Sequence, residues 1–526
     1  MAFEPNFEKI TASYRKNIGS TQSQIDCKLP LVDDVKKVIC SNAKASVTKA
    51  EYNGKEVVYS GYVAFQVVYL NNEGTPLAID YTAEFNETYG YVVDGVVTPV
   101  VTANVVDVNT QVVGGEIKVV AIMETTIDGI FNESQNVLVG VVGDNVFVKN
   151  DILTYSSFVG TVQDRFEENN DLEIKDSVSK VLTVCPSVYL ESVEVFDRYV
   201  QVKGGIFVDV SYVTDNNVIR TMQGRFDFSR EVAGDDVGTD SFVQSVVQIA
   251  LNDVKITTSL DADMAIVNVF VPIMYKGFVF NKTTVDVVSD LFSGTHYTGI
   301  NVNSLPTMRE YAELSFDDKI SGSVEIQESA PFIDEMLGVC CGNVTLANAS
   351  VNDGNFTVEG VAHTNVLYLN KELNTICSVE VEMPFSLVNP VDYPNESTPI
   401  VHLSLTEINA RARRGKDIEV TATLLAFANF FENDKDAVIT AVTEEDEVLE
   451  EDCALSIYLA KDGDTIWDIA KELRVSPESL IEQNPNLSEP IVAGTKIVVY
   501  RQKQVEYWCH IFPKKTNRNV RFFCLN

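Results

Sequence analysis

Basic residues, histidines and long apolar runs are all scarce in this sequence. Lys and Arg together number 40 against 76 Asp and Glu, which gives a formal net charge of −36 at pH 7. A chain this acidic offers no broad basic face, so we expect no nucleic-acid binding and repulsion from anionic membranes and wall polymers. No segment approaches about 18 uninterrupted apolar residues, so we expect no transmembrane segment.

The nine cysteines are sparse and irregularly spaced. This distribution is typical of a reduced cytosolic protein. The first twenty residues, MAFEPNFEKITASYRKNIGS, lack the apolar core of a secretory signal, which also favours the cytosol. Cys340-Cys341 is the one adjacent pair, and it has no second cysteine pair or histidines at ligand spacing. We expect these thiols to be buried as small apolar side chains, and we expect no metal site.

Catalytic motifs are also missing. The sequence contains no HExxH, no GxSxG, no phosphate-binding loop ending in GK[ST] and no dinucleotide fingerprint. Carboxylates are so abundant that no pair stands out for hydrolytic chemistry. We therefore expect a protein that is not an enzyme, with no catalytic residues and no cofactor.

Short runs of Val, Ile, Thr, Phe and Tyr with period-two alternation dominate the chain up to about residue 440, and helical periodicity is rare there. This pattern predicts antiparallel strands in sandwiches or barrels. Three of the runs share a Gly followed eight residues later by a Tyr, and a Phe follows each Gly at a nearly constant distance. The three sets are Gly61/Tyr69/Phe85, Gly204/Tyr212/Phe228 and Gly360/Tyr368/Phe385. We interpret them as three diverged copies of one domain.

Each copy is preceded by a similar segment, which we expect to hold a short strand and then an acidic helical piece. These segments are SQIDCKLPLVDDVKKVI, LEIKDSVSKVLTV and VEIQESAPFIDEML. The predicted repeats occupy residues 1–150, 151–300 and 301–440. Residues 441–454 hold the acidic run EEDEVLEED, which predicts an extended linker, with a solvated strand edge as the alternative. The last segment, 502–526, is basic and aromatic, and its role stays open.

Residues 455–501 show a different pattern. A short strand precedes Gly463-Asp464-Thr465, and an amphipathic helix follows, with Thr465 as N-cap and Asp468 completing a capping box. Ser476-Pro477 starts a second helix that presents Leu480 and Ile481 inward. Gly494 turns the chain into a closing strand over residues 496–500. The prediction is a compact β-α-α-β unit.

This unit resembles a LysM module, the small carbohydrate-binding repeat of many bacterial wall proteins. The matching residues are Asp462-Gly463-Asp464-Thr465, Ile466, Ile469-Ala470, Val475-Ser476, Leu480, Asn484, Gly494 and Ile497. The usual hydrophobic residue before the Gly-Asp-Thr turn is shifted or replaced, since Ala460 stands there. By matching position, the resemblance implies a ligand groove lined by Asp464, Thr465, Ile466, Trp467, Asn484, Pro490 and Ile491.

Trp467 is the strongest candidate among these groove residues, because an exposed indole can stack on a sugar or anchor a protein partner. A partly buried core position is an equally good interpretation of the same residue. Core packing for Ile466, turn closure for Asn484 and helix capping for Asp464 are the stronger interpretations of those residues.

Three β-rich repeats followed by a LysM resemble the SipL-like family of bacterial spore-coat morphogenetic proteins, whose repeats are SPOCS domains, also catalogued as DUF3794. The resemblance implies a scaffold in the mother-cell cytoplasm, at the forespore surface. There the LysM would dock the SpoIVA-like ATPase of the coat basement layer, and the repeats would make further contacts, self-association among them. The alternative is a protein that binds N-acetylglucosamine chains of peptidoglycan or cortex through its LysM.

Overall fold

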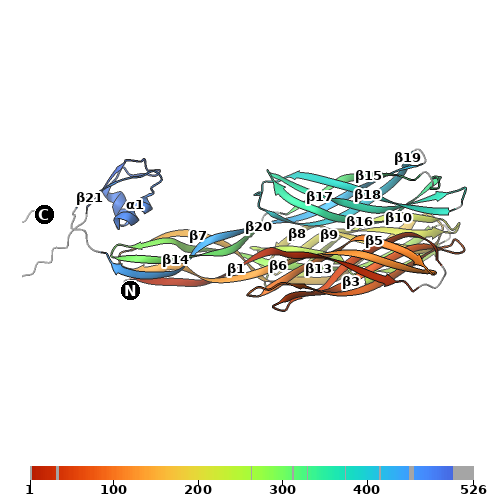
Figure 1. Cartoon of the computed structure of the whole chain (residues 1–526), viewed down its shortest axis with the longest axis horizontal. Helices are drawn as coiled ribbons and strands as arrows, with labels where there is room; N and C mark the ends of the chain where they lie inside the picture. Colours follow the sequence, from red (N-terminus) through yellow and green to blue (C-terminus); the bar gives the residue numbers. More distant parts are fainter. Residues whose placement is uncertain are drawn as a thin grey trace, which may run out of the picture.

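The computed structural model describes residues 3–30, 35–261, 264–310, 313–327, 330–373, 375–413, 416–448 and 455–500. A broad bundle of strands makes up one end of an elongated molecule and narrows to a stalk, and the small helical module lies at the tip of that stalk (Figure 1). The prediction of a mainly β chain with a β-α-α-β module is confirmed.

Three units follow one another along the chain with the same strand order. Unit 1 contains β1 (Phe3–Lys28), β2 (Val35–Tyr52), β3 (Glu56–Asn71), β4 (Pro76–Gly90), β5 (Val97–Val113) and β6 (Glu116–Gly143). Unit 2 contains β7 (Val146–Ile174), β8 (Val178–Phe196), β9 (Tyr199–Thr214), β10 (Ile219–Ala233), β11 (Ser241–Ile249), a 3-10 turn η1 (Leu251–Asp253), β12 (Lys255–Asp261) and β13 (Met264–Ser293). Unit 3 contains β14 (His296–Glu310), β15 (Leu314–Glu325), β16 (Glu335–Asn352), β17 (Asn355–Asn370), β18 (Thr375–Pro390), β19 (Thr398–Arg413) and β20 (Asp417–Glu447).

Each unit is built from two antiparallel sheets. In unit 1 the first and last strands pair in the order β1-β6-β5, and the middle strands form the meander β2-β3-β4. Unit 2 repeats this plan with β13 between β7 and the β11/β12 pair, beside the meander β8-β9-β10. Unit 3 repeats it with β20 between β14/β15 and β19, beside β16-β17-β18. The inward side chains of both sheets share one core in each unit, as in a β-sandwich.

The glycine and phenylalanine of each repeat lie directly opposite each other on paired strands. Their pairs are Gly61↔Phe85, Gly204↔Phe228 and Gly360↔Phe385. A Cβ on Gly360 would lie 2.2 Å from the Thr345 carbonyl oxygen and 2.6 Å from the Phe385 ring, and the other two glycines are equally crowded. Only glycine leaves room for the aromatic ring to lie across its backbone. This close approach is the physical reason for the repeat pattern in the sequence.

The stalk is made of the outer ends of the long first and last strands. β1 and β6, for example, stay paired from Phe3↔Gly143 to Lys28↔Lys118, far longer than one sandwich requires. The three outer two-stranded ribbons, one per unit (β1 with β6, β7 with β13, β14 with β20), turn their apolar faces toward one another. Ile10 and Val137 of unit 1, Leu153 and Val287 of unit 2, and Leu305 and Val438 of unit 3 form one buried cluster there. The stalk is therefore a three-sided core shared by all units.

A second shared core joins the three units inside the broad bundle. Its buried residues come from unit 1 (Ile39, Cys40, Val68, Leu70), unit 2 (Leu182, Cys185, Val213, Ile219) and unit 3 (Leu337, Cys340, Cys341, Leu367, Ile376). We call this cluster the three-unit junction. Cys185 and Cys341 form a disulfide within it. The expectation that these cysteines are reduced is therefore wrong for this pair, because the packing of units 2 and 3 brings together thiols that are 156 residues apart.

Three sequence expectations need correction. The unit boundaries fall at residues 144–145 and 294–295 instead of 150 and 300, because β7 and β14 begin just after tight turns. The segments before each copy contain no helix in their described residues; β2, β8 and β16 begin inside them as strands, since their valines and leucines pack into sheet cores. Of the two interpretations of the acidic run, the extended linker is wrong and the strand is right as far as Glu447, because β20 pairs with β14 there. Residues 449–454 and 501–526 lie outside the described residues.

The helices of the described ranges are short, and none is long and apolar enough to cross a membrane.

Candidate functional site: the helical module and its contact with the stalk

The terminal module contains β21 (Leu455–Leu459), α1 (Ile466–Leu473), α2 (Pro477–Gln483) and β22 (Lys496–Tyr500). Thr465 caps α1, its hydroxyl accepting from the Asp468 amide at 3.2 Å while the Asp468 carboxylate accepts from the Thr465 amide at 3.1 Å. The predicted capping box is confirmed. Ile469 and Ala470 are buried on the inner face of the helix, as its periodicity predicts.

The second helix begins at Ser476-Pro477 as predicted, with the Ser476 hydroxyl accepting from the Ser479 amide at 2.9 Å. Leu480 is buried, but Ile481 is exposed, so the prediction that both point inward is wrong for Ile481. A helix this short presents only one position per turn to the two-stranded sheet, and Leu480 takes it.

Asn484 closes α2 and ties it to the sheet. Its Nδ2 donates to the carbonyl oxygens of Leu480 and Val498 at 2.9 and 2.8 Å, and its Oδ1 accepts from the Val498 amide at 2.9 Å. All polar atoms of this side chain are therefore engaged within the module. The turn-closure interpretation of Asn484 describes this geometry.

The remaining predicted groove residues gather where the start of α1 faces the loop after α2. The Ile466 amide donates to Oε1 of Glu489 at 2.7 Å, so the Glu489 carboxylate crosses the groove to the helix N-terminus. Pro490 next to it is exposed, whereas Ile491 is buried in the module core. Asp464 closes its own turn by accepting from the Lys461 amide at 2.7 Å and the Tyr458 hydroxyl at 3.0 Å. A ligand in this groove would have to displace Glu489.

Trp467 points away from this groove, toward the tip of the stalk. Its indole Nε1 donates to Oδ2 of Asp290 at 2.8 Å, and its ring meets the ring of Phe292 edge-on, with centroids 5.2 Å apart and planes at 66°. Phe292 is buried in the same cluster as the module core, and Phe147 packs against that cluster from β7. The strongest groove candidate is thus a contact between the module and unit 2.

Two cations, one in α1 and one at its C-cap, complete the contact. Lys471 Nζ lies 2.7 Å from both carboxylate oxygens of Asp290, whose side chain is 27% exposed. Arg474 donates from Nη1 to the carbonyl oxygens of Ser293 and His296 at 3.0 and 3.1 Å, and its guanidinium lies 4.1 Å from the centroid of the Tyr297 ring. Together these residues fix the orientation of the module on the stalk.

The opposite side of the module carries an exposed apolar face. Alternate residues of β21 and the residue paired with Leu455 on β22 point away from the helices. These are Leu455 (47% exposed), Ile457 (62%), Leu459 (57%) and Tyr500 (63%). We call this set the outer face. Four large apolar side chains on one small surface are the kind of patch that marks a protein interface.

The comparisons with known proteins identify two regions of the chain. Residues 458–499 match the family model of the LysM domain. The chain has a LysM domain. Residues 335–411 match the model described as SipL, SPOCS domain. That region runs from β16 into β19 of unit 3, and units 1 and 2 repeat its strand order. No curated protein and no solved structure matches the chain.

Sequence reasoning missed the residues of the stalk that receive the LysM. Asp290, Phe292 and His296 sit at or beside the ends of β13 and β14, where their residue types are ordinary for a strand end. Nothing in their spacing signals a docking site, because the partner helix lies more than 170 positions away in sequence. In the described part of the chain, no group of three or more His, Cys, Asp or Glu side chains is arranged to hold a metal ion.

Proposed function

We propose that this protein is a non-enzymatic scaffold of spore-coat assembly, in which the LysM outer face docks a protein of the coat basement layer. A SpoIVA-like ATPase is the expected partner, and the SPOCS-type units make the further assembly contacts. The mother-cell side of the forespore surface is the expected location. The pairing of a SipL-type SPOCS domain with a LysM supports a sporulation role.

The observation that carries this proposal is the docked orientation of the LysM. Trp467 is committed to Asp290 and Phe292, so the indole is not available as a free plate for a sugar. Glu489 crosses the groove, while the outer face stays exposed. The apolar outer face is therefore accessible to a protein partner, whereas the Glu489 carboxylate obstructs the groove in which a glycan would bind.

The shape of the molecule supports a linking role. The LysM lies at the stalk tip and the broad bundle lies at the other end (Figure 1). If the outer face of the LysM binds one layer of an assembly and the broad bundle binds another, the rigid stalk between them joins the two layers. The stalk has the shared apolar core that rigidity requires.

A retention assay with the purified full-length chain tests the proposal. One bait is the immobilised basement-layer ATPase and the other is insoluble peptidoglycan. We expect retention by the ATPase, a loss of at least tenfold in Ile457→Asp, and no change in Ile152→Asp, which makes the same substitution at an exposed stalk position. Equal retention of both variants, or retention by peptidoglycan alone, would reject docking through the outer face.

The second candidate function is binding of N-acetylglucosamine chains, which the LysM match supports as a class. Glu489→Ala separates the two candidates, because it removes the carboxylate that crosses the groove. If the groove binds glycan, this variant should change retention by peptidoglycan. If the outer face docks a protein, the variant should leave retention by the ATPase unchanged.

A further inference from the structure

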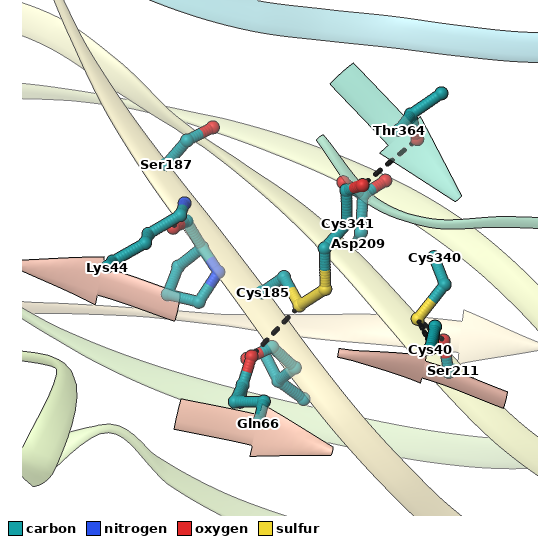
Figure 2. The surroundings of a disulfide bond; sticks show 12 residues. Cys40, Lys44, Gln66, Cys185, Ser187, Asp209, Ser211, Cys340, Cys341 and Thr364 are labelled. Atoms are coloured by element: carbon teal, nitrogen blue, oxygen red, sulfur yellow. Dashed lines mark hydrogen bonds between the residues drawn. A yellow bond between two sulfur atoms is a disulfide. The ribbon is translucent and has the colours of Figure 1, made fainter. Parts of the chain in front are cut away.

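Four cysteines from all three units meet in the three-unit junction. Cys40 lies on β2, Cys185 on β8, and Cys340-Cys341 on β16. Figure 2 shows the disulfide between Cys185 and Cys341, with Cys340 and Cys40 close together beside it. The adjacent pair of unit 3 thus faces unit 2 with one sulfur and unit 1 with the other.

The second pair is in contact without being bonded. Cys40 Sγ and Cys340 Sγ lie 2.7 Å apart, although the residues are 300 positions apart in sequence, and both side chains are buried. The Ser211 hydroxyl donates to Cys340 Sγ from 3.9 Å, a weak contact. The backbone around Cys341 is fixed by the Thr364 hydroxyl, which donates to its carbonyl oxygen at 2.9 Å. Both sulfurs are therefore held facing each other by the packing of units 1 and 3.

We propose that Cys40 and Cys340 are a site of oxidative cross-linking and form a second disulfide between units. With this bond and Cys185–Cys341, unit 3 is joined covalently to both other units at the junction. The cross-link constrains a chain segment of some 300 residues, so it restricts the unfolded chain strongly. Oxidation would then lock the three units around their shared core.

The oxidant required is a small-molecule disulfide such as oxidised glutathione. One cysteine thiolate attacks a sulfur of the small disulfide, forming a mixed disulfide and releasing one thiol. The second cysteine thiolate then displaces the other thiol and forms the Cys40–Cys340 bond. The two cysteines lose two protons and two electrons, and the small disulfide is reduced to two thiols.

The environment of the pair sets the rate of this step. Hydrogen bonding to Cys340 and burial raise the pKa of the Cys40 thiol well above its usual value. Little thiolate forms in the closed junction, so we expect cross-linking during folding or on slow opening of the bundle. Cys27, which is also buried and whose pKa burial raises to about 11, has no thiol within contact in the described residues and should stay free.

Peptide mapping of the full-length protein tests the proposal. The chain is refolded with oxidised glutathione, alkylated while being denatured, and digested without reduction. We expect one species in which the peptides carrying Cys40, Cys185 and Cys340-Cys341 are held together. Cys40→Ser should lose only the Cys40 peptide from this species, and Cys27→Ser should leave it intact.

Two results would overturn the proposal. One is a Cys40 thiol that is alkylated as completely as Cys27 in a sample whose Cys185–Cys341 bond has formed. The other is the same melting temperature before and after oxidation in a Cys185→Ser/Cys341→Ser variant, which retains Cys40 and Cys340. We expect that variant to melt at a higher temperature once oxidised, and we expect the rise to disappear when Cys40 is also replaced by serine.

Discussion

The Trp467 indole donates a hydrogen bond of 2.8 Å to the Asp290 carboxylate, 177 residues earlier in the chain. This bond joins the first turn of α1 in the LysM to the last residues of β13 in the stalk. The same carboxylate receives Lys471, so one side chain holds two donors of one helix face. Loss of Asp290 should therefore release the LysM without unfolding it.

We expect Asp290→Ala to weaken docking of the LysM by about 1–3 kcal/mol, because it leaves two donors without their acceptor. Hydrogen exchange of the α1 amides, measured by mass spectrometry, should become faster, while exchange in β3 stays unchanged. Asp286→Ala removes an exposed carboxylate from the same strand and is the matched control. Identical exchange in the two variants would mean that the Asp290 contact does not hold the module.

Arg474 has two roles, in docking the LysM and in ending α1, and a substitution can separate them. It ends α1 in the left-handed conformation, with φ 53°, and it also donates to the stalk carbonyl oxygens. Glycine adopts this conformation without the cost of about 1–2 kcal/mol that other residues incur. We expect Arg474→Gly to keep the helix end but lose the docking bonds. The α1 amides should then exchange faster only where they face the stalk, whereas faster exchange throughout the LysM would contradict this separation.

The glycine of each repeat predicts a steric effect. We expect Gly360→Ala to lower the free energy of unfolding by about 1–3 kcal/mol, because the new Cβ meets the Thr345 carbonyl oxygen and the Phe385 ring. Urea unfolding followed by far-UV circular dichroism measures the loss. Gly140→Ala is the control, since a Cβ there meets nothing within 4 Å. Equal midpoints for the two variants would count against the steric explanation.

Two histidines predict opposite pH dependences of stability. Burial lowers the pKa of His402, whose Nε2 donates to the Ser245 carbonyl oxygen at 2.7 Å, and the positive charge of Arg15 lowers it further. Below about pH 6.5 the unfolded chain takes up a proton that the folded chain resists. The contribution of His402 is therefore present above that pH and is lost as the pH falls toward the folded pKa.

The contribution of His363 to stability depends on pH in the opposite direction. The Glu380 carboxylate, with Oε1 3.6 Å from Nδ1 of His363, raises the pKa of His363, so its contribution to stability is present below about pH 6.5 and is lost as the pH rises through the folded pKa. We expect His402→Gln to flatten the loss of stability between pH 7 and 5, by at most about 1.4 kcal/mol per pH unit. His363→Gln should cost more stability at pH 5.5 than at pH 8. Urea midpoints across this range measure both effects. If the stability lost on substitution changed with pH in the same direction for both histidines, the opposite pKa shifts would be contradicted.

The sequence was sufficient wherever a local rule decided the structure. The paired Gly and Phe of each repeat predicted three related β units, because the close approach that they allow must recur in every copy. The Thr465 capping box and Ser476-Pro477 predicted both LysM helices, because caps act on their own first turn. The two expected helical features that failed, the segments before each copy and the inward Ile481, depend on which side chains the sheets bury.

The sequence alone determined the class of each unit, the order of the units and the position of the LysM. Tertiary structure decided the rest: the three-sided stalk, the meeting of Cys40 with Cys340 and Cys185 with Cys341, and the turn of Trp467 toward Asp290. The physical reason is the distance along the sequence over which each interaction acts. Caps, turns and strand alternation act over a few residues, whereas these contacts join residues more than a hundred positions apart and exist only once the three units have packed around one another.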